Sequence, residues 1–62
     1  MDKSIEFFKK AINLNPDNGW LFENLAEVYL ADGHKGLAAS YFQTACGLRY
    51  EKACVALRQM GF

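Results

Sequence analysis

The chain has 62 residues, with seven basic and seven acidic side chains and a formal net charge of zero at pH 7. A single domain of this size has a marginal core, so we expect a disulfide, a partner subunit or the rest of a longer array to add stability. Balanced charge gives no electrostatic footprint for nucleic acid or a membrane surface, and no apolar stretch approaches the about 20 residues of a membrane span. No signal-peptide core is seen near the start, so the default compartment is cytoplasmic, and it stays unknown if the chain is a fragment of an exported protein.

Apolar residues recur at helical spacing along nearly the whole chain, without the alternation of a β-strand. The four predicted helices span residues 2–14, about 18–32, about 35–46 and about 51–60. Pro16 lies in the first connection, and Gly33 can adopt the left-handed conformation that closes a helix. Short connections favour antiparallel neighbours, so the predicted fold class is all-α, a stack of helical hairpins. The residues expected to face inward on the last two helices are Leu37, Ala38, Tyr41, Phe42, Ala45, Cys46, Cys54 and Leu57, with Val55 as a further candidate.

An internal repeat defines the kind of stack. The motif Ser4-x3-Phe8-x2-Ala11 recurs as Ala38-x3-Phe42-x2-Ala45, displaced by thirty-four residues (38 minus 4). Between the two copies lie Phe22, Leu25, Ala26, Tyr29 and Gly33 at the spacing Phe-x2-Leu-Ala-x2-Tyr-x3-Gly. With this period and these positions, the chain resembles tetratricopeptide repeat proteins from Ser4 to about Leu48. The resemblance implies one short solenoid domain in which residues 2–14 are the second helix of a partial repeat, 18–48 one complete repeat and 51–61 a capping helix.

The two cysteines, Cys46 and Cys54, are eight residues apart (54 minus 46). A segment of this kind resembles the Sel-like relatives of the tetratricopeptide repeat, some of which join two cysteines at this spacing in a disulfide. The resemblance therefore implies a disulfide, while two packed thiols stay open and a cytosolic location would favour them. A zinc site would need four ligands, and His34 is the only histidine. Cys54 takes the place of Phe22 on the last helix if the register shortens by two (54 minus 22 is 32). Arg58 departs from the Sel-like pattern, and this departure favours the interpretation of the last helix as a terminal cap.

Nothing in the sequence supports catalysis or a cofactor. Glu23 and Glu27 share a helix face, but we interpret them as exposed surface and not as an acid/base pair. The resemblance implies a protein-interaction module, not an enzyme, that binds a peptide or partner helix in a concave groove. The groove positions implied by the resemblance are Trp20, Glu23, Asn24, Glu27 and Leu30. Lys52 or Arg58 contributes only if the last helix keeps register, and the glutamates oppose an acidic ligand.

Self-association is the alternative prediction. Phe7 and Phe8 leave more apolar surface on the first helix than one neighbouring helix can hide, and such surface commonly marks an interface. The chain is then a homo-oligomer, a helix-swapped dimer or a fragment of a longer repeat array. Neither reading includes nucleic acid, a membrane or a metal ion as a partner.

Overall fold

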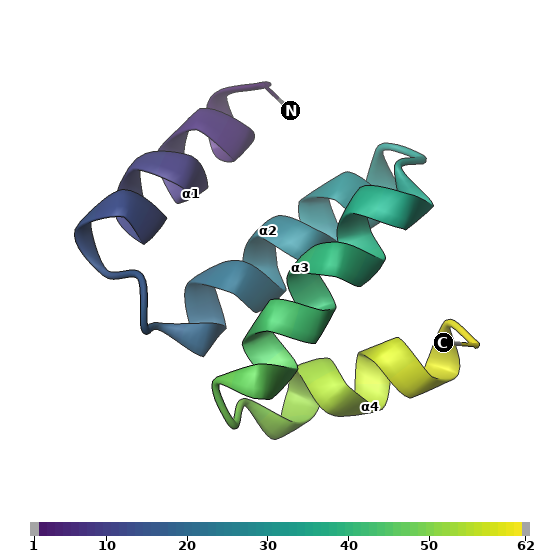
Figure 1. Ribbon diagram of the computed structural model, residues 1–62. Helices are drawn as coiled ribbons and strands as arrows, with labels where there is room; N and C mark the ends of the chain where they lie inside the picture. Colours follow the sequence, from purple (N-terminus) through teal and green to yellow (C-terminus); the bar gives the residue numbers. More distant parts are fainter. Residues whose placement is uncertain (1, 62) are drawn as a thin grey trace.

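The computed structural model describes residues 2–61, apart from the side chain of residue 2, and in that range it contains four α-helices and no strand (Figure 1). The helices are α1 (Asp2–Leu14), α2 (Gly19–Ala31), α3 (Lys35–Gly47) and α4 (Glu51–Gln59). The all-α prediction is confirmed, and each helix boundary lies within one or two residues of the predicted one.

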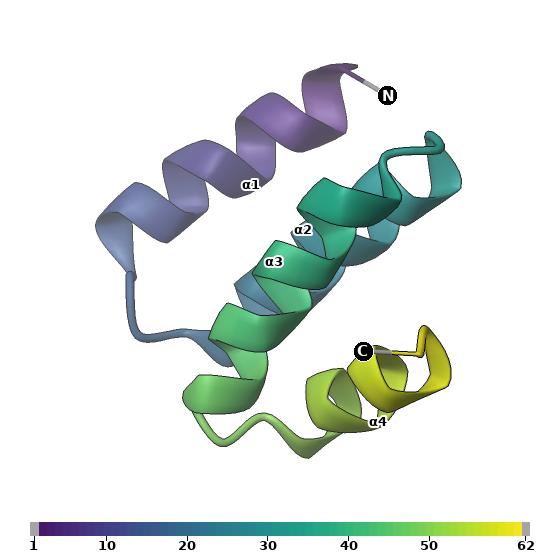
Figure 2. The same cartoon turned by 45° about the vertical axis from the view of Figure 1, so that its right-hand side comes forward.

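The central unit is an antiparallel hairpin made by α2 and α3, and the other two helices lie on opposite sides of it (Figures 1 and 2). Among the described helices α1 packs only against α2, whereas α4 packs against α3 and also touches α2. The result is a thin slab with extents of 28 × 25 × 13 Å. Each helix is thus added beside the preceding one, as in a solenoid.

Small side chains let the two helices of the hairpin approach closely. Ala26, Ala38 and Ala45 are fully buried between α2 and α3, where Leu25 and Phe42 fill the space around them. Side chains larger than alanine at the three small positions would push the helix backbones apart, because protein interiors are close-packed. The predicted packing roles of these residues are confirmed.

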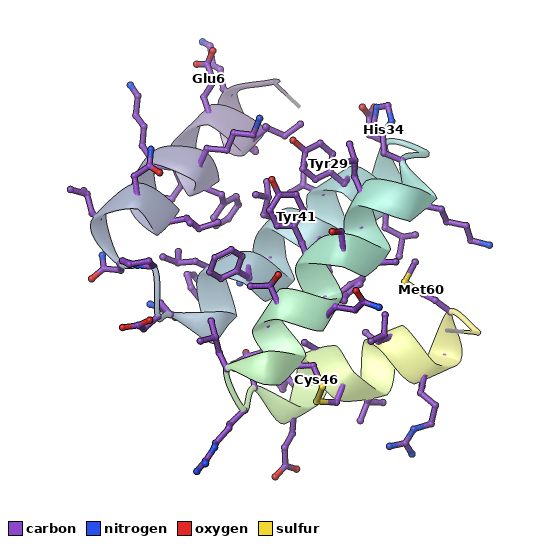
Figure 3. All side chains as sticks on the ribbon, in the orientation of Figure 1. Glu6, Tyr29, His34, Tyr41, Cys46 and Met60 are labelled. Atoms are coloured by element: carbon purple, nitrogen blue, oxygen red, sulfur yellow. A yellow bond between two sulfur atoms is a disulfide. The ribbon has the colours of Figure 1, made fainter. Side chains whose placement is uncertain are left out.

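Aromatic side chains extend this core toward α1. The rings of Phe22 and Tyr41 are stacked with centroids 6.2 Å apart, and Tyr41 stacks on Tyr29 at 5.5 Å. In Figure 3 the labelled rings of Tyr29 and Tyr41 lie between the hairpin and α1. Tyr29 also meets the imidazole of His34 edge to face at 5.9 Å, at the end of the hairpin. The stack therefore fixes the face of the hairpin that α1 approaches.

Two of the residues expected to face inward are exposed, and those expectations were wrong. Leu37 is 48% exposed because it lies one turn before Tyr41, where α1, packed only on α2, does not cover α3. Val55 is 47% exposed because it lies about 200° around α4 from Ala53, which is fully buried against the hairpin.

The turns set the register of the last helix. Gly33 has φ +85°, which confirms its predicted left-handed conformation after α2. The turn before α2 has four residues, 15–18, whereas the turn before α4 has three, 48–50, with Arg49 at φ +69°. Because α3 ends thirty-three residues after α1 (47 minus 14) and the turn that follows it is one residue shorter, α4 begins thirty-two residues after α2 (51 minus 19). This is the shortened offset expected for Phe22 and Cys54.

Within residues 2–61, each helix falls short of the length and apolar composition needed to cross a membrane.

Candidate functional site

The solvent-facing side of α2 carries a stripe of side chains one turn apart. Trp20, Asn24 and Glu27 lie at positions i, i+4 and i+7, which places them on one face of the helix. Trp20 is 50% exposed, Glu27 is exposed and Asn24 is half-buried. Leu30 is exposed near the C-terminal end of the same helix. We call Trp20, Asn24, Glu27 and Leu30 the α2 stripe.

Glu23 does not belong to this exposed surface, and its interpretation as an exposed glutamate was wrong. Its side chain is only 8% exposed. The cause is the approach of α4 to α2, which also places the charge of Lys52 close enough to act on the Glu23 carboxyl. Sequence periodicity puts Glu23 beside Trp20 and Glu27, but only the packing of α4 distinguishes it from them.

The environment of Glu23 raises the pKa of its carboxyl from 4.5 to about 7. Burial is the largest cause, because removing the carboxylate from water disfavours its charged form. A side-chain hydrogen bond with Glu27 and the charge of Glu27 raise the pKa further, whereas the Lys52 ammonium lowers it. Near pH 7 the two carboxyls therefore carry less than two full negative charges, and the α2 surface is less acidic than the sequence implies.

Trp20 and Asn24 are held by neighbours. The indole of Trp20 meets the ring of Phe8 edge to face at 6.4 Å, so α1 supports one side of it. The side-chain amide of Asn24 donates a hydrogen bond of 2.8 Å from Nδ2 to the backbone carbonyl of Trp20. One amide N–H is therefore already used, while its second N–H and its carbonyl oxygen can still pair with a ligand backbone.

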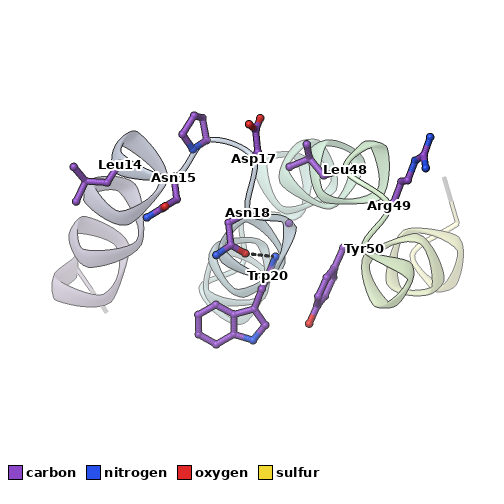
Figure 4. Close-up of a pocket in the computed structure, with 10 residues that line it drawn as sticks. Leu14, Asn15, Asp17, Asn18, Trp20, Leu48, Arg49 and Tyr50 are labelled. Atoms are coloured by element: carbon purple, nitrogen blue, oxygen red, sulfur yellow. Dashed lines mark hydrogen bonds between the residues drawn. The ribbon is translucent and has the colours of Figure 1, made fainter.

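An open cavity with a volume of about 580 Å³ adjoins Trp20 at the ends of the helices. It is lined by Leu14, Asn15, Pro16, Asp17, Asn18, Gly19, Trp20, Leu48, Arg49 and Tyr50. In Figure 4 the side chains of Trp20 and Tyr50 point to the same side, away from Asp17 and Leu48. Gly19 permits this arrangement, because a Cβ atom there would lie 2.8 Å from the Cβ of Tyr50. The N-cap residue Asn18 accepts a hydrogen bond of 3.1 Å from the Trp20 N–H, which fixes the start of α2.

Tyr50 was not among the predicted site residues. It is the N-cap residue of α4 and stands thirty-two residues after Asn18 (50 minus 18), the N-cap residue of α2. This correspondence was the available signal, and it shows that the two turns lining the cavity occupy equivalent places in the repeat.

Cys46 and Cys54 form a disulfide in the structure, with a Cα–Cα distance of 4.8 Å. It joins the end of α3 to the beginning of α4, and the bond is visible beside the labelled Cys46 in Figure 3. The resemblance implied this pair, and its two cysteines lie at disulfide distance. Residues 2–61 contain no group of three or more histidine, cysteine, aspartate or glutamate side chains arranged to hold a metal ion.

The stack of antiparallel helices, with small residues at the hairpin contact and an exposed stripe on α2, defines a helical-repeat scaffold. A model of the family described as tetratricopeptide repeat matches residues 7–60. The chain belongs to the tetratricopeptide repeat family, which is a family of protein-interaction scaffolds and is generally non-enzymatic. Searches of curated proteins and of solved structures gave no match.

Proposed function

We propose that this chain binds a peptide or a partner helix along the α2 stripe, in the groove between α2 and the first turn of α4. The observation that carries the proposal is the exposure of Trp20 and Glu27 with Asn24 between them, on a helix whose other side forms the core. A large apolar ring, an amide and a charge in one row give a ligand three different kinds of contact.

Each residue of the stripe has a distinct proposed role. Trp20 is the aromatic anchor, since tryptophan is enriched among the residues that dominate binding energy. Asn24 pairs with the ligand backbone through its free amide groups. Glu27 selects a basic side chain and opposes an acidic one, because its charge is exposed. Leu30 adds an apolar contact at the far end of the groove.

Glu23 and Lys52 have supporting roles in this proposal. The buried Glu23 carboxyl does not reach the ligand but positions the α2–α4 contact beside Trp20. Lys52 is exposed on the first turn of α4, and in this proposal it forms the opposite edge of the groove. Because Glu27 is the exposed carboxyl of the stripe and Lys52 acts on Glu23, the ligand that fits best carries one basic group and apolar neighbours.

We propose the same domain organisation for the whole chain: residues 2–14 as half of a repeat, 18–48 as a complete repeat and 51–61 as a cap. Support for the cap comes from the size of Arg58, which stands where the Sel-like pattern usually has glycine or alanine. Gly61, with φ +90°, turns the chain directly after α4.

The test is a selection of peptides from a random displayed library against the immobilised protein, followed by calorimetric titration of the peptides obtained. We expect Trp20→Ala to weaken binding by at least tenfold and Asn24→Ala by several-fold. Leu37→Ala is the matched control, because Leu37 is about as exposed as Trp20 but lies on α3. Selected peptides that bind the Trp20→Ala variant with unchanged affinity would refute the groove as their site.

A further inference from the structure

Equivalent faces of α1 and α3 differ in what covers them, although the same pattern recurs after thirty-four residues. The α3 face consists of Ala38, Tyr41, Phe42 and Ala45, and the α1 face of Ser4, Phe7, Phe8 and Ala11. On α3 the two alanines and the phenylalanine are fully or almost fully buried in the core shared with α2, and the tyrosine stacks on two rings of α2. On α1 the serine is exposed and Phe7 is 63% exposed. The face that α2 covers on α3 is therefore open on α1.

A second face is used in the same way by both helices. On α1 this face packs against α2 through Ile5, Phe8 and Ile12. The equivalent α3 residues are Ala39, Phe42 and Cys46. Cys46 is bonded to α4, and Ala39 lies two turns before it on the same side of the helix. Each helix thus packs on the helix that follows it. Among the described helices, only α3 also has a neighbour on its first face.

The open positions form a continuous stripe along α1. At 100° per residue, Leu14 lies about 20° from Phe7 on one side, and Ala11 and Ser4 lie about 40° and 60° away on the other. Leu14 is 81% exposed, so both large side chains of the stripe face solvent. We call Ser4, Phe7, Ala11 and Leu14 the α1 stripe.

One edge of the α1 stripe is basic. Lys3 and Lys10 are exposed, and they lie about 40° and 60° from Phe7, on the side away from the small residues. Glu6 is on the same side but about 100° from Phe7, so the edge keeps a net charge of plus one. The two lysines are seven residues apart, which is two turns or about 10 Å. An edge with two acidic side chains at that spacing is complementary to it, whereas a second basic edge is repelled.

The α2–α3 hairpin shows which apolar pattern fits the stripe. The ring of Tyr41 stacks on both Phe22 and Tyr29, which lie two turns apart on α2. Leu25 and Ala26, both fully buried, come between these two rings in the sequence. Phe7 takes the place of Tyr41 on α1, so a helix that covers the stripe needs two aromatic side chains two turns apart, with a leucine and an alanine between them.

The same hairpin gives the positions of the acidic residues on such a helix. Lys3 and Lys10 take the places of Leu37 and Thr44 on α3. In an antiparallel pair of helices, the α2 positions that lie on the adjoining edge, at about the same distance from the turn, are Leu21 and Val28. These two positions come directly before the two aromatic residues of α2. An acidic residue directly before each aromatic residue therefore faces a lysine of α1.

We propose that the α1 stripe is the docking surface for an amphipathic helix of another protein, with the pattern acidic-aromatic-x2-leucine-alanine-x-acidic-aromatic. This helix occupies on α1 the place that α2 occupies on α3, and its acidic residues meet Lys3 and Lys10. The proposal goes beyond the peptide groove, because it concerns a second surface with the opposite charge preference. The groove opposes acidic ligands, whereas the α1 stripe selects them.

The test uses a synthetic peptide with the sequence of residues 17–33, in which Leu21→Glu and Val28→Glu supply the two acidic side chains. Calorimetric titration of the 62-residue protein with this peptide should show one-to-one binding that Phe7→Glu weakens at least tenfold. Leu37→Glu is the matched control on α3 and should leave the affinity unchanged. Circular dichroism shows whether each variant folds, and both altered side chains are exposed.

A charge exchange tests the basic edge. Lys3→Glu and Lys10→Glu should each weaken binding about threefold or more, while Lys52→Glu, on α4 beside the groove, should leave it unchanged. A second peptide with lysine at both acidic positions should bind the Lys3→Glu, Lys10→Glu double variant more tightly than the original protein.

Three results would overturn the proposal. The first is no binding of the acidic peptide at millimolar concentration, or equal affinity of the original protein for the two peptides. The second is binding that Lys52→Glu weakens and Lys10→Glu does not, because the peptide would then lie in the groove. The third is a dimer of the protein in sedimentation equilibrium that Phe7→Glu dissociates, because a second copy would then cover the stripe.

Discussion

Removing the Cys46–Cys54 disulfide should destabilise the protein more than any single surface substitution. The disulfide ties α4, a helix of nine residues, to α3. A helix of this length is not stable by itself in water, so its order depends on the contacts and the covalent link that hold it. The fully buried Ala53 lies inside the loop that the bond closes, and the half-buried Leu57 follows Cys54 by three residues.

The magnitude follows from the loop that the bond closes. With a sequence separation of eight, loop-closure entropy gives about 2.5 kcal/mol at 25 °C. In a domain of this size 1 kcal/mol corresponds to about 4–8 °C in Tm, so the expected loss is about 10–20 °C. The assay is thermal unfolding followed by circular dichroism for the oxidised protein and the Cys46→Ala, Cys54→Ala double variant.

Reduced wild-type protein is the matched control, because it keeps both cysteine side chains and lacks only the covalent bond. It should unfold close to the double variant. If the oxidised protein and the double variant differ by less than about 2 °C, the bond does not stabilise the native state and the reasoning fails.

Four further substitutions test individual parts of the structure. Gly19→Ala should lower the free energy of unfolding by about 1–3 kcal/mol, because the new Cβ would lie 2.8 Å from the Cβ of Tyr50. Gly36 has open space around it, so Gly36→Ala should raise the free energy of unfolding by up to about 1 kcal/mol. Equal midpoints of urea unfolding for the two variants would contradict this. Arg49→Gly should stabilise the protein by about 0.5–1 kcal/mol in the same assay, because a backbone φ of +69° is costly for a residue with a side chain. A loss of stability would show that the contacts of the arginine side chain matter more than the backbone conformation. The pKa of Glu23 is about 7 in the folded protein, against an ordinary value of 4.5. Between pH 4.5 and pH 7 the folded protein therefore binds a proton that the unfolded chain does not. The stabilisation from this proton is fully present below pH 4.5 and is lost as the pH rises through 7. Glu23→Gln should therefore flatten the fall in Tm between pH 5 and pH 8, and an unchanged slope would show that Glu23 is not the titrating group.

The sequence predicted the helices and their order well because both follow from local spacing. Ala26, Ala38 and Ala45 stand where two helices must approach closely, and Phe42 stands where a large side chain must fill the space. These constraints belong to a repeat of thirty-four residues, so they can be recognised before any contact is known. The position of Gly33 in a left-handed turn follows from its lack of a side chain in the same way.

The parts that the sequence did not predict depend on which neighbour covers each face. Glu23 and Glu27 have the same helical spacing to their neighbours, yet only Glu23 is covered by α4. Leu37 has an apolar side chain on a helix of the core, but no described helix lies over that part of α3. The cavity beside Tyr50 depends on two turns of different length, which periodicity cannot distinguish.

The most direct test of the proposed function is to locate a selected peptide on the surface by amide chemical-shift mapping of the labelled protein. We expect the largest shifts along the α2 stripe, at Trp20, Asn24 and Glu27, with smaller ones at Lys52 on α4. Shifts concentrated on α1 or on α3, with the α2 stripe unchanged, would contradict the claim that this chain binds its partner through the groove.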